Sequence, residues 1–437
     1  MIDNWKEYFV SRRISAKEAV DMIQSGDTIV EGQGLGRSEI FMEPMLERAD
    51  ELKNVNIVCA SHRGREDYCD PKYEGIFKVH SFFLNPGING SKDAVWQGRA
   101  EYYPVPFYRQ AAAMKKMDPD IFFVQTTAPN SDGYVSLGVS VDYCADVMKF
   151  AKKIIAHVNP AMPWTEGDGI FPVTDIDYFV QHEIPITELV VSEVLSDTDT
   201  KIAEYVASLV HDGDTLQIGT GSVPDKVMKL LSNHKHLGIH SEMGSMGLMR
   251  LMQSGVIDNT CKTLDRGYSV FSLLAGFQEL YDYVDHNPDI IMKPASYVTN
   301  PMVIAQQKNF VAINSAIQVD LLGQIVADMI GPKQYSGVGG QLDFMRGADL
   351  SEGGRAIICM PSTAAKGKVS RIVPFISNGA AVSDTRYDAM YIITEYGIAD
   401  LWGKSTSERA KALIEIAHPD FRADLEEAFE KQIRKIV

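Results

Sequence analysis

The sequence is poor in cysteine, lacks long apolar runs and has no excess of basic residues. Its five cysteines lie far apart, and no two of them form a C-x-x-C pair. An odd, scattered set of this kind is typical of reduced thiols and argues against a disulfide framework. No apolar stretch approaches the about 18 residues that a membrane helix needs. The residues Met1–Lys6 lack the basic start and apolar core of a secretory signal peptide, so we expect a cytoplasmic protein.

The charge balance is acidic, with 42 basic and 58 acidic side chains and a formal net charge of −16. This balance argues against a protein that binds nucleic acid through clustered Lys and Arg. It permits an anionic small ligand that is held by backbone amides. Three of the ten histidines cluster at His234, His236 and His240, with Glu242 as the one acidic residue at metal-ligand spacing. We therefore expect no zinc site.

A repeat at a constant offset of 187 residues organises the chain. In residues 19–38 and again in 206–225, an apolar-striped helix leads into Gly-Asp-Thr, a short apolar strand and a glycine loop. Gly26 and Gly213, which begin the two Gly-Asp-Thr triplets, are predicted to be helix C-caps. Ser15 and Glu18 predict a capping box at the start of the first helix. The repeat predicts two related domains.

The alternation of helices with short apolar strands predicts parallel sheets that are covered on both faces by helices. The predicted strands are Thr28–Val30, Asn56–Cys59, Asp120–Val124, Thr215–Ile218, Leu237–His240 and Phe310–Asn314. With 437 residues and 45% apolar side chains, the chain can bury more than one core. We predict an α/β protein of two tandem, structurally similar open α/β domains with mainly parallel sheets, at residues 1–188 and 189–437.

Two glycine loops are candidate ligand sites. Gly219–Pro224 lies between a strand and a predicted helix at Asp225–Leu231, where free N–H groups attract anions. Glu242 follows at the distance of a dinucleotide-binding acid, but Pro224 replaces the third glycine of that fingerprint, so a nicotinamide site is disfavoured. The second loop, Ser336–Phe344, is either a tight turn or a ligand loop. Glu242 itself ends a predicted strand and is either a nucleophile or a structural ion-pair partner.

Four motifs occur together and in this order: Gly219–Pro224, His240–Met243, Gly337–Phe344 and Thr394–Ala399. At these spacings the chain resembles the family I CoA-transferases over essentially its whole length. The resemblance is closest to the acetyl-CoA hydrolase/transferase group and, within it, to the enzymes that act on 4-hydroxybutyrate. It implies ping-pong transfer of coenzyme A between a short-chain acyl-CoA, such as acetyl- or butyryl-CoA, and a free carboxylate such as 4-hydroxybutyrate. It also implies a homodimer or larger homo-oligomer that uses CoA as a substrate and holds no permanent cofactor.

The resemblance further implies roles for single residues. Glu242 is expected to attack the thioester and to pass through an acyl-glutamyl anhydride to a glutamyl-CoA thioester. Gly339 and Gly340 are expected to form the oxyanion loop, and the amide of Asn300 to support the glutamate. The residues expected to contact CoA are Gly219, Thr220, Gly221, Ser222, Val223, Asn314, Ala316 and Gly339.

Two stretches depart from the family pattern. Gly244–Gly247 replaces a usual Ser-Asp-Gly sequence, and Gly32–Glu39, which is expected to face the acyl group, lacks a proline. Arg37 in the second stretch could bind the second carboxylate of a dicarboxylic acid such as succinate or itaconate. We favour a surface arginine, since arginines are mostly exposed.

Two other classes remain open for the chain as a whole. One is an acyl-CoA hydrolase on the same scaffold, in which water replaces the acceptor acid. The other is a non-catalytic acyl-CoA sensor or a sugar-phosphate isomerase-like α/β domain. A sensor would keep its role without the Glu242 carboxylate, and an isomerase would not need Glu242 together with the Gly339-Gly340 loop.

Overall fold

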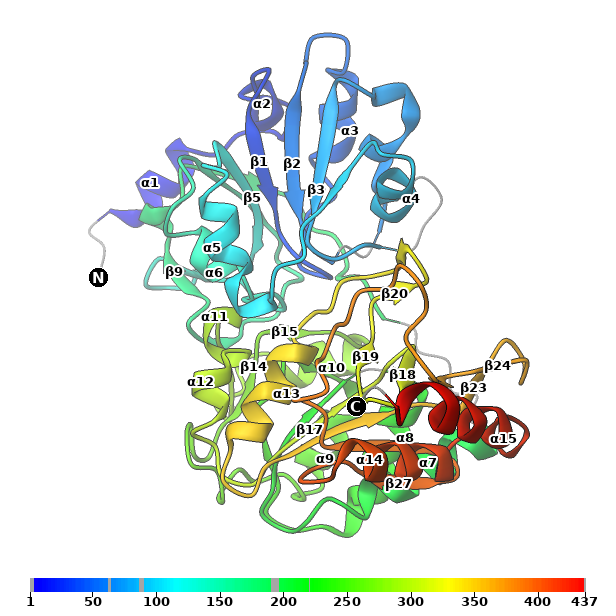
Figure 1. Ribbon diagram of the computed structural model, residues 1–437. Helices are drawn as coiled ribbons and strands as arrows, with labels where there is room; N and C mark the ends of the chain where they lie inside the picture. Colours follow the sequence, from blue (N-terminus) through cyan, green and yellow to red (C-terminus); the bar gives the residue numbers. More distant parts are fainter. Residues whose placement is uncertain (1–3, 62–63, 86–89, 190–195, 220, 436–437) are drawn as a thin grey trace. The chain divides into compact units, whose positions relative to one another are not determined.

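The computed structural model describes residues 4–61, 64–85, 90–189, 196–219 and 221–435 (Figure 1). Its contacts divide the chain into two compact units. The first comprises Met1–Val190, Glu242–Met246 and Val270–Val298, and the second comprises Val191–Ser241, Gly247–Ser269 and Thr299–Val437. A division at residue 188 stays a prediction, and the compact units differ from it by two segments from the second half of the chain.

The first unit is built on a seven-stranded sheet in the order β10-β7-β5-β1-β2-β3-β4, and each neighbouring pair is parallel. The central strands β1, β5 and β7 are buried along their whole length. Continuous burial is what a parallel sheet covered on both faces requires. The strands are β1 (Thr28–Glu31), β2 (Val55–Cys59), β3 (Phe77–Ser81), β4 (Glu101–Tyr102), β5 (Ile121–Thr126), β7 (Ile154–Val158) and β10 (Tyr178–Gln181).

The second unit is built on a six-stranded sheet in the order β12-β11-β17-β22-β26-β27. Its pairs are parallel except the last, β26 with β27, which is antiparallel. The strands are β11 (Thr215–Ile218), β12 (Gly238–Ile239), β17 (Phe310–Asn314), β22 (Arg355–Cys359), β26 (Tyr391–Thr394) and β27 (Gly397–Asp400).

The two sheets repeat the same order around the predicted repeat. Strand β1 lies between β5 and β2, with Ile29 opposite Ile57 and Ile121. Strand β11 lies between β17 and β12 in the same way, with Leu216 opposite Ile239 and Val311. The prediction of two similar open α/β folds with mainly parallel sheets is therefore confirmed.

Helices and short strands fill the connections between the sheet strands. The helices are α1 (Trp5–Ser11), α2 (Ala16–Asp21), α3 (Met42–Glu47), α4 (Ser91–Trp96), α5 (Gln110–Lys115), α6 (Cys144–Val147), α7 (Asp197–Ala207), α8 (Ser222–Leu230), α9 (Met246–Gln253), α10 (Gln278–Val284), α11 (Ala295–Val298), α12 (Pro301–Ile304), α13 (Gln341–Leu350), α14 (Thr406–Glu415) and α15 (Pro419–Ala428). The short strands are β6 (Tyr134–Ser136), β8 (Glu166–Gly167), β9 (Ile170–Pro172), β13 (Met243–Gly244), β14 (Ser269–Phe271), β15 (Leu273–Leu274), β16 (Ile290–Met292), β18 (Gln318–Asp320), β19 (Ile325–Val326), β20 (Met329–Ile330), β21 (Lys333–Gln334), β23 (Thr363–Ala364), β24 (Val369–Ser370) and β25 (Ile372–Val373). Among the residues that the structure describes, no helix combines the length and apolarity of a membrane span.

Local sequence features set where several helices begin. The capping box of Ser15 and Glu18 is confirmed, with the Ser15 side chain accepting from the Glu18 N–H and the Glu18 carboxylate accepting from the Ser15 N–H. Helix α8 begins at Ser222, three residues before the predicted start, and Pro224 lies in its first turn. Proline fits there because the first turn needs no internal N–H donor.

The expected helix C-caps at Gly26 and Gly213 are wrong. Helices α2 and α7 end earlier, at Asp21 and Ala207. Both glycines lie in the tight turn that enters the strand, with φ of 90° and 84°. Their N–H groups donate to the carbonyls of Lys53 and Lys235, which lead into the next strands. The positive φ was needed for this turn rather than for a helix end.

The aspartate of each Gly-Asp-Thr triplet closes the same turn. Asp27 accepts from the N–H of Gln24 at 2.8 Å, and Asp214 accepts from the N–H of His211 at 2.6 Å. Asp214 also binds the Arg355 guanidinium of β22 at 2.6 Å, and its side chain is only 3% exposed. The second copy therefore adds a buried ion pair between β22 and the turn that leads into β11.

Substituting Asp214→Ala is expected to destabilise the protein by about 3–5 kcal/mol, because it leaves the Arg355 charge buried without its carboxylate. Asp27→Ala is the matched control, since it removes the same turn bond without an ion pair among the described residues, and should cost about 1 kcal/mol. Urea denaturation measures both variants. Equal losses for the two would contradict this account of the ion pair.

Candidate active site

The carboxyl ends of β11 and β17 lie side by side in the second unit. Ile218 is opposite Ile313, and the Gly219 N–H donates to the Ile313 carbonyl at 3.1 Å. The side chains of Gln217 and Asn314 join the two strand ends by two reciprocal amide hydrogen bonds, at 2.9 and 3.2 Å. The structure thus brings together Gly219 and Asn314, which the sequence predicts as CoA contacts, at the edge where open α/β sheets bind ligands.

The first glycine loop ends at a helix N-terminus. Gly221 is the N-cap of α8 with φ of 134°, a conformation that favours glycine. Ser222 and Val223 are the first two residues of α8, so their N–H groups have no partner within the helix. These N–H groups are at the N-terminal end of the helix. This arrangement suits an anion or a polar carbonyl. Thr220 lies outside the described residues.

The same edge continues with a polar cluster that the sequence analysis did not assign. The Arg371 guanidinium donates to the Ala316 carbonyl at 3.1 Å, next to the expected CoA-contacting segment. The Ser362 N–H and hydroxyl donate to the Glu395 carboxylate at 2.8 and 2.7 Å. Glu395 belongs to the Thr394–Ala399 motif, which therefore supports the loop after β22. The Glu395–Ser362 contact spans 33 residues, too far apart for local patterns to reveal.

The second glycine loop leads into another helix N-terminus in the same unit. Gly339 has φ of 59°, and Gly340 is the N-cap of α13, accepting from the Phe344 N–H at 2.9 Å. The left-handed conformation at Gly339 explains its lack of a side chain. Backbone N–H groups at such a position can stabilise an oxyanion.

Glu242 belongs to the first unit and lies directly before β13. Its carbonyl accepts from the N–H groups of Ser272 and Leu273, both at 3.0 Å, and its side chain is half-buried. The backbone of the expected nucleophile is therefore held where the pairing of β13 with β15 begins. Asn300 belongs to the second unit, where its side-chain oxygen caps α12 by accepting from the Met302 N–H at 3.0 Å.

One segment of the first unit connects the backbone around Glu242 with the loop expected to face the acyl group. The N–H groups of Val141 and Asp142 donate to the Ser272 carbonyl. Asp142 is fully buried and accepts from the Ser140 hydroxyl at 2.5 Å. Burial raises the pKa of Asp142 to about 6, against the lowering effect of its hydrogen bonds. Ser140 in turn packs against Gly36, where a β-carbon would lie 2.5 Å from the Ser140 Cβ.

Arg37 is not a surface residue, so the interpretation that the sequence favoured is wrong. It is 4% exposed, and its Nε lies 3.1 Å from Glu31 Oε2. It also donates to the Arg65 carbonyl at 2.6 Å, while the Tyr68 hydroxyl donates to Glu31. Burial alone would lower the pKa of the Arg37 guanidinium, and the Glu31 carboxylate outweighs it and raises that pKa. The guanidinium is therefore already matched by an internal carboxylate rather than left for a substrate.

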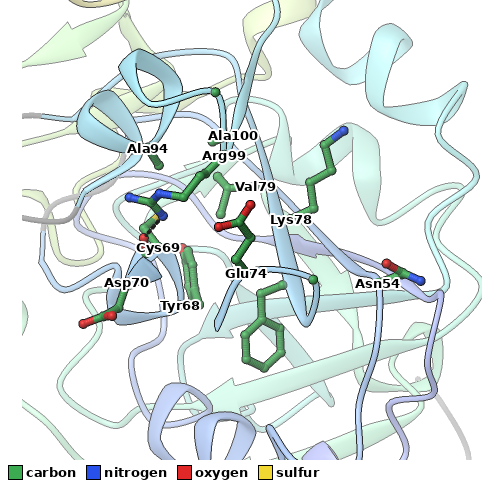
Figure 2. A pocket seen from close by; sticks show the side chains of 13 residues that line it. Asn54, Tyr68, Cys69, Asp70, Glu74, Lys78, Val79, Ala94, Arg99 and Ala100 are labelled. Carbon is green, nitrogen blue, oxygen red and sulfur yellow. Dashed lines mark hydrogen bonds between the residues drawn. The ribbon is translucent and has the colours of Figure 1, made fainter. Parts of the chain in front are cut away.

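Two clefts in the first unit contain none of the expected site residues. One, of about 210 Å³, is bordered by the charged side chains of Asp70, Glu74, Lys78 and Arg99, with Tyr68 and Cys69 beside them (Figure 2). Arg99 donates there to the Cys69 carbonyl and to Gln97. The other, of about 510 Å³, follows the carboxyl ends of β5 and β7. Within the described part of the chain, no group of His, Cys, Asp and Glu side chains is arranged to hold a metal ion.

Substituting Gly36→Ala is expected to destabilise the first unit by about 1–3 kcal/mol, because the new methyl group would overlap the Ser140 Cβ. The double variant Gly36→Ala/Ser140→Gly removes the overlapping atom and should recover part of that loss, with Ser140→Gly alone as the control. Thermal and urea unfolding measure the three variants. Strictly additive losses would contradict a direct contact between the two residues.

Comparison with known proteins agrees with this arrangement. Residues 3–191 match the acetyl-CoA hydrolase/transferase N-terminal domain, and residues 276–429 match the C-terminal domain of that family. The chain is 43% identical to 4-hydroxybutyrate coenzyme A transferase of Clostridium kluyveri, over 98% of this chain and 99% of that protein. It is 34% identical to succinyl-CoA:cyclohexane-1-carboxylate CoA transferase of Geobacter metallireducens, over 99% and 98% of the two chains.

A solved structure has the same fold over its whole length. The crystal structure of RipA from Yersinia pestis superimposes with a TM-score of 0.90 at 33% identity and covers 98% of this chain and 99% of its own. Together, the matching family domains, the full-length relatives and the two repeated parallel sheets place the chain in the acetyl-CoA hydrolase/transferase family, as a CoA-transferase.

Proposed function

We propose that this enzyme transfers coenzyme A between a short-chain acyl-CoA, such as acetyl- or butyryl-CoA, and 4-hydroxybutyrate or a similar free carboxylate. The observation that carries the proposal is the 43% identity to 4-hydroxybutyrate coenzyme A transferase over nearly the whole of both chains. The strand-end loops of the second unit add support, because they present backbone N–H groups at two helix N-termini.

The proposed reaction proceeds through Glu242 in steps that conserve the activated carbonyl. A Glu242 oxygen attacks the acyl carbonyl, the C–S bond breaks, and CoA leaves as a thiolate from an acyl-glutamyl anhydride. The thiolate then attacks the glutamyl carbonyl, which releases the first acid and leaves a glutamyl-CoA thioester. The acceptor carboxylate reverses both steps, so each half-reaction ends with one thioester, and no net proton or electron is transferred.

Each step passes through a tetrahedral oxyanion, whose stabilisation dominates such barriers. We assign this role to the backbone N–H groups of Gly339 and Gly340. Asn300 is assigned to the support of the glutamate, in addition to its cap on α12. The CoA contacts are assigned to Gly219, Thr220, Gly221, Ser222, Val223, Asn314, Ala316 and Gly339. A cytoplasmic homodimer or larger homo-oligomer completes the proposal.

Two alternatives concern the acceptor. Water in place of the acid would make the enzyme an acyl-CoA hydrolase, an activity that the family name includes. A dicarboxylic acid such as succinate or itaconate is the other, since a relative of 34% identity is named for succinyl-CoA. Arg37 does not favour that acid, because Glu31 already neutralises it.

Mixing the protein with acetyl-CoA or butyryl-CoA, without an acceptor, is expected to form a covalent adduct. Intact-protein mass spectrometry should show an increase equal to CoA less one water, and peptide mapping should place it on the peptide that contains Glu242. Glu242→Ala should show neither adduct nor transfer, because no carboxylate remains to attack. Transfer rates to 4-hydroxybutyrate, acetate and succinate then rank the acceptors.

The alternatives give different outcomes in the same mixture. Free CoA that accumulates without an adduct would support the hydrolase. A wild-type protein that forms no adduct and turns over no acyl-CoA in the presence of 4-hydroxybutyrate would refute the proposed transferase reaction. The variant Glu47→Ala, which changes an exposed carboxylate at the end of α3 in the first unit, serves as the matched control and should keep the adduct.

A further inference from the structure

The dipeptide Ser383-Asp384 lies against the segment that leads to the second glycine loop. The N–H groups of Ser383 and Asp384 donate to the Ile325 carbonyl at 2.8 and 3.3 Å, and the Ile325 N–H donates to the Asp384 carbonyl at 3.0 Å. This isolated β-bridge fixes the dipeptide by its backbone, so that its two side chains are free to make other contacts.

The Ser383 side chain holds the chain before the glycine loop. Its hydroxyl donates to Asp328 Oδ1 at 2.5 Å. The other oxygen of Asp328 accepts from Gln334 Nε2 at 2.7 Å, and the Asp328 carbonyl accepts from the Tyr335 N–H at 2.8 Å. Gln334 Nε2 also reaches the Ser336 carbonyl at 2.9 Å. The residues that enter the loop are therefore tied to Ser383 through Asp328.

The Asp384 side chain holds the chain after the glycine loop. Its Oδ2 accepts from Gln341 Nε2 at 2.6 Å, and Gln341 directly follows Gly340 as the first residue of α13. Asp384 is completely buried, and its Oδ1 has no hydrogen-bond partner among the described residues. A buried carboxyl group with one oxygen that lacks a hydrogen bond destabilises the folded protein. Asp384 is therefore unfavourable for stability alone, although it lies beside the loop.

We propose that Asp384 is a positioning residue for CoA transfer, which acts through Gln341 to hold the N–H groups of Gly339 and Gly340 in place for the oxyanion. The catalytic part of this inference rests on the proposed function of that loop. A dry, rigid donor site needs such support, because small displacements of an oxyanion donor reduce the rate strongly. Asp384 itself touches no reacting atom in this account.

The surroundings of Asp384 make its protonation state sensitive to pH near neutrality. Burial raises its pKa from the ordinary 3.8 to about 7, opposed by the Gln341 hydrogen bond. Asp388 and Asp328 raise the pKa further, and Arg346 lowers it. Below pH 7 the neutral acid keeps its bond to Gln341. Above pH 7 the carboxylate adds a negative charge beside the loop and opposes a second one on the oxyanion.

The raised pKa of Asp384 also makes the stability of the folded protein depend on pH. The folded state holds the Asp384 proton more tightly than the unfolded state, whose pKa is the ordinary 3.8. The Asp384 contribution to stability therefore falls as the pH rises from about 4 to about 7 and stays low above that. Asp384→Asn, which keeps a neutral partner for Gln341, should raise the melting temperature over wild type at pH 8 more than at pH 5.

The decisive test compares Asp384→Asn and Asp384→Leu with Asp320→Asn. Asp320 is a matched control, since it is buried in the same unit and accepts from Gln324 Nε2 at 2.7 Å within its own turn. Asp384→Leu should lower kcat about tenfold to a hundredfold with little change in KM, because it loosens a donor needed only in the transition state. Wild-type kcat is expected to decline above pH 7, and Asp384→Asn should retain kcat and lose that decline.

Hydrogen exchange of residues 336–346 gives a readout that needs no turnover. Asp384→Leu should speed this exchange about tenfold, while Asp384→Asn and Asp320→Asn stay near wild type. If Asp384→Leu does not fold, Gln341→Met breaks the same bond from the other side and should behave alike. Unchanged exchange and unchanged kcat in the variants that break the bond would overturn the inference. A wild type without transfer or adduct refutes the proposed function instead, and the exchange result still decides whether Asp384 holds the loop.

Discussion

Parallel strand pairing is the constraint on which the rest of this structure depends. Every parallel neighbour must be reached by a crossover, so all the strands of a sheet end at the same edge and their loops gather there. In the second unit, the pairing of Ile218 with Ile313 places the Gly219 loop against Asn314, although 95 residues separate the paired positions. The candidate CoA loop and its neighbours follow from this register rather than from contacts between nearby residues.

The glycine loops that follow β1 and β11 in the two copies of the repeat differ in what they contact. In the first unit the loop after β1 is buried, and its Arg37–Glu31 ion pair neutralises charge inside the protein. In the second unit the equivalent loop ends at the N-terminus of α8, and the neutral Gln217–Asn314 amide pair joins the strand ends beside it. One scaffold thus supplies a buried loop with an internal ion pair and a loop that ends at a helix N-terminus, a place that suits an anion.

Much of the fold could be predicted because its evidence is local: the Gly-Asp-Thr repeat, the short apolar strands and the Ser15 capping box. The family motifs also led to Glu242 and to both glycine loops. What could not be predicted depends on partners far apart in sequence, such as Gln341 with Asp384 or Ser362 with Glu395. Arg37 shows the same limit, since composition favours exposure and only the folded sheet reveals that Glu31 neutralises it. The C-caps predicted at Gly26 and Gly213 are wrong because a positive φ serves a turn as well as a helix end.

In the proposed reaction a carboxylate of this chain carries CoA between two acids, and an oxygen-18 label distinguishes this route from direct transfer. The glutamyl-CoA form would be discharged once by an acceptor labelled at both carboxylate oxygens, and the products examined by mass spectrometry. The anhydride route predicts one labelled oxygen in the new acyl-CoA and one in the peptide that contains Glu242. Formation of the acyl-CoA without label in that peptide would contradict the account.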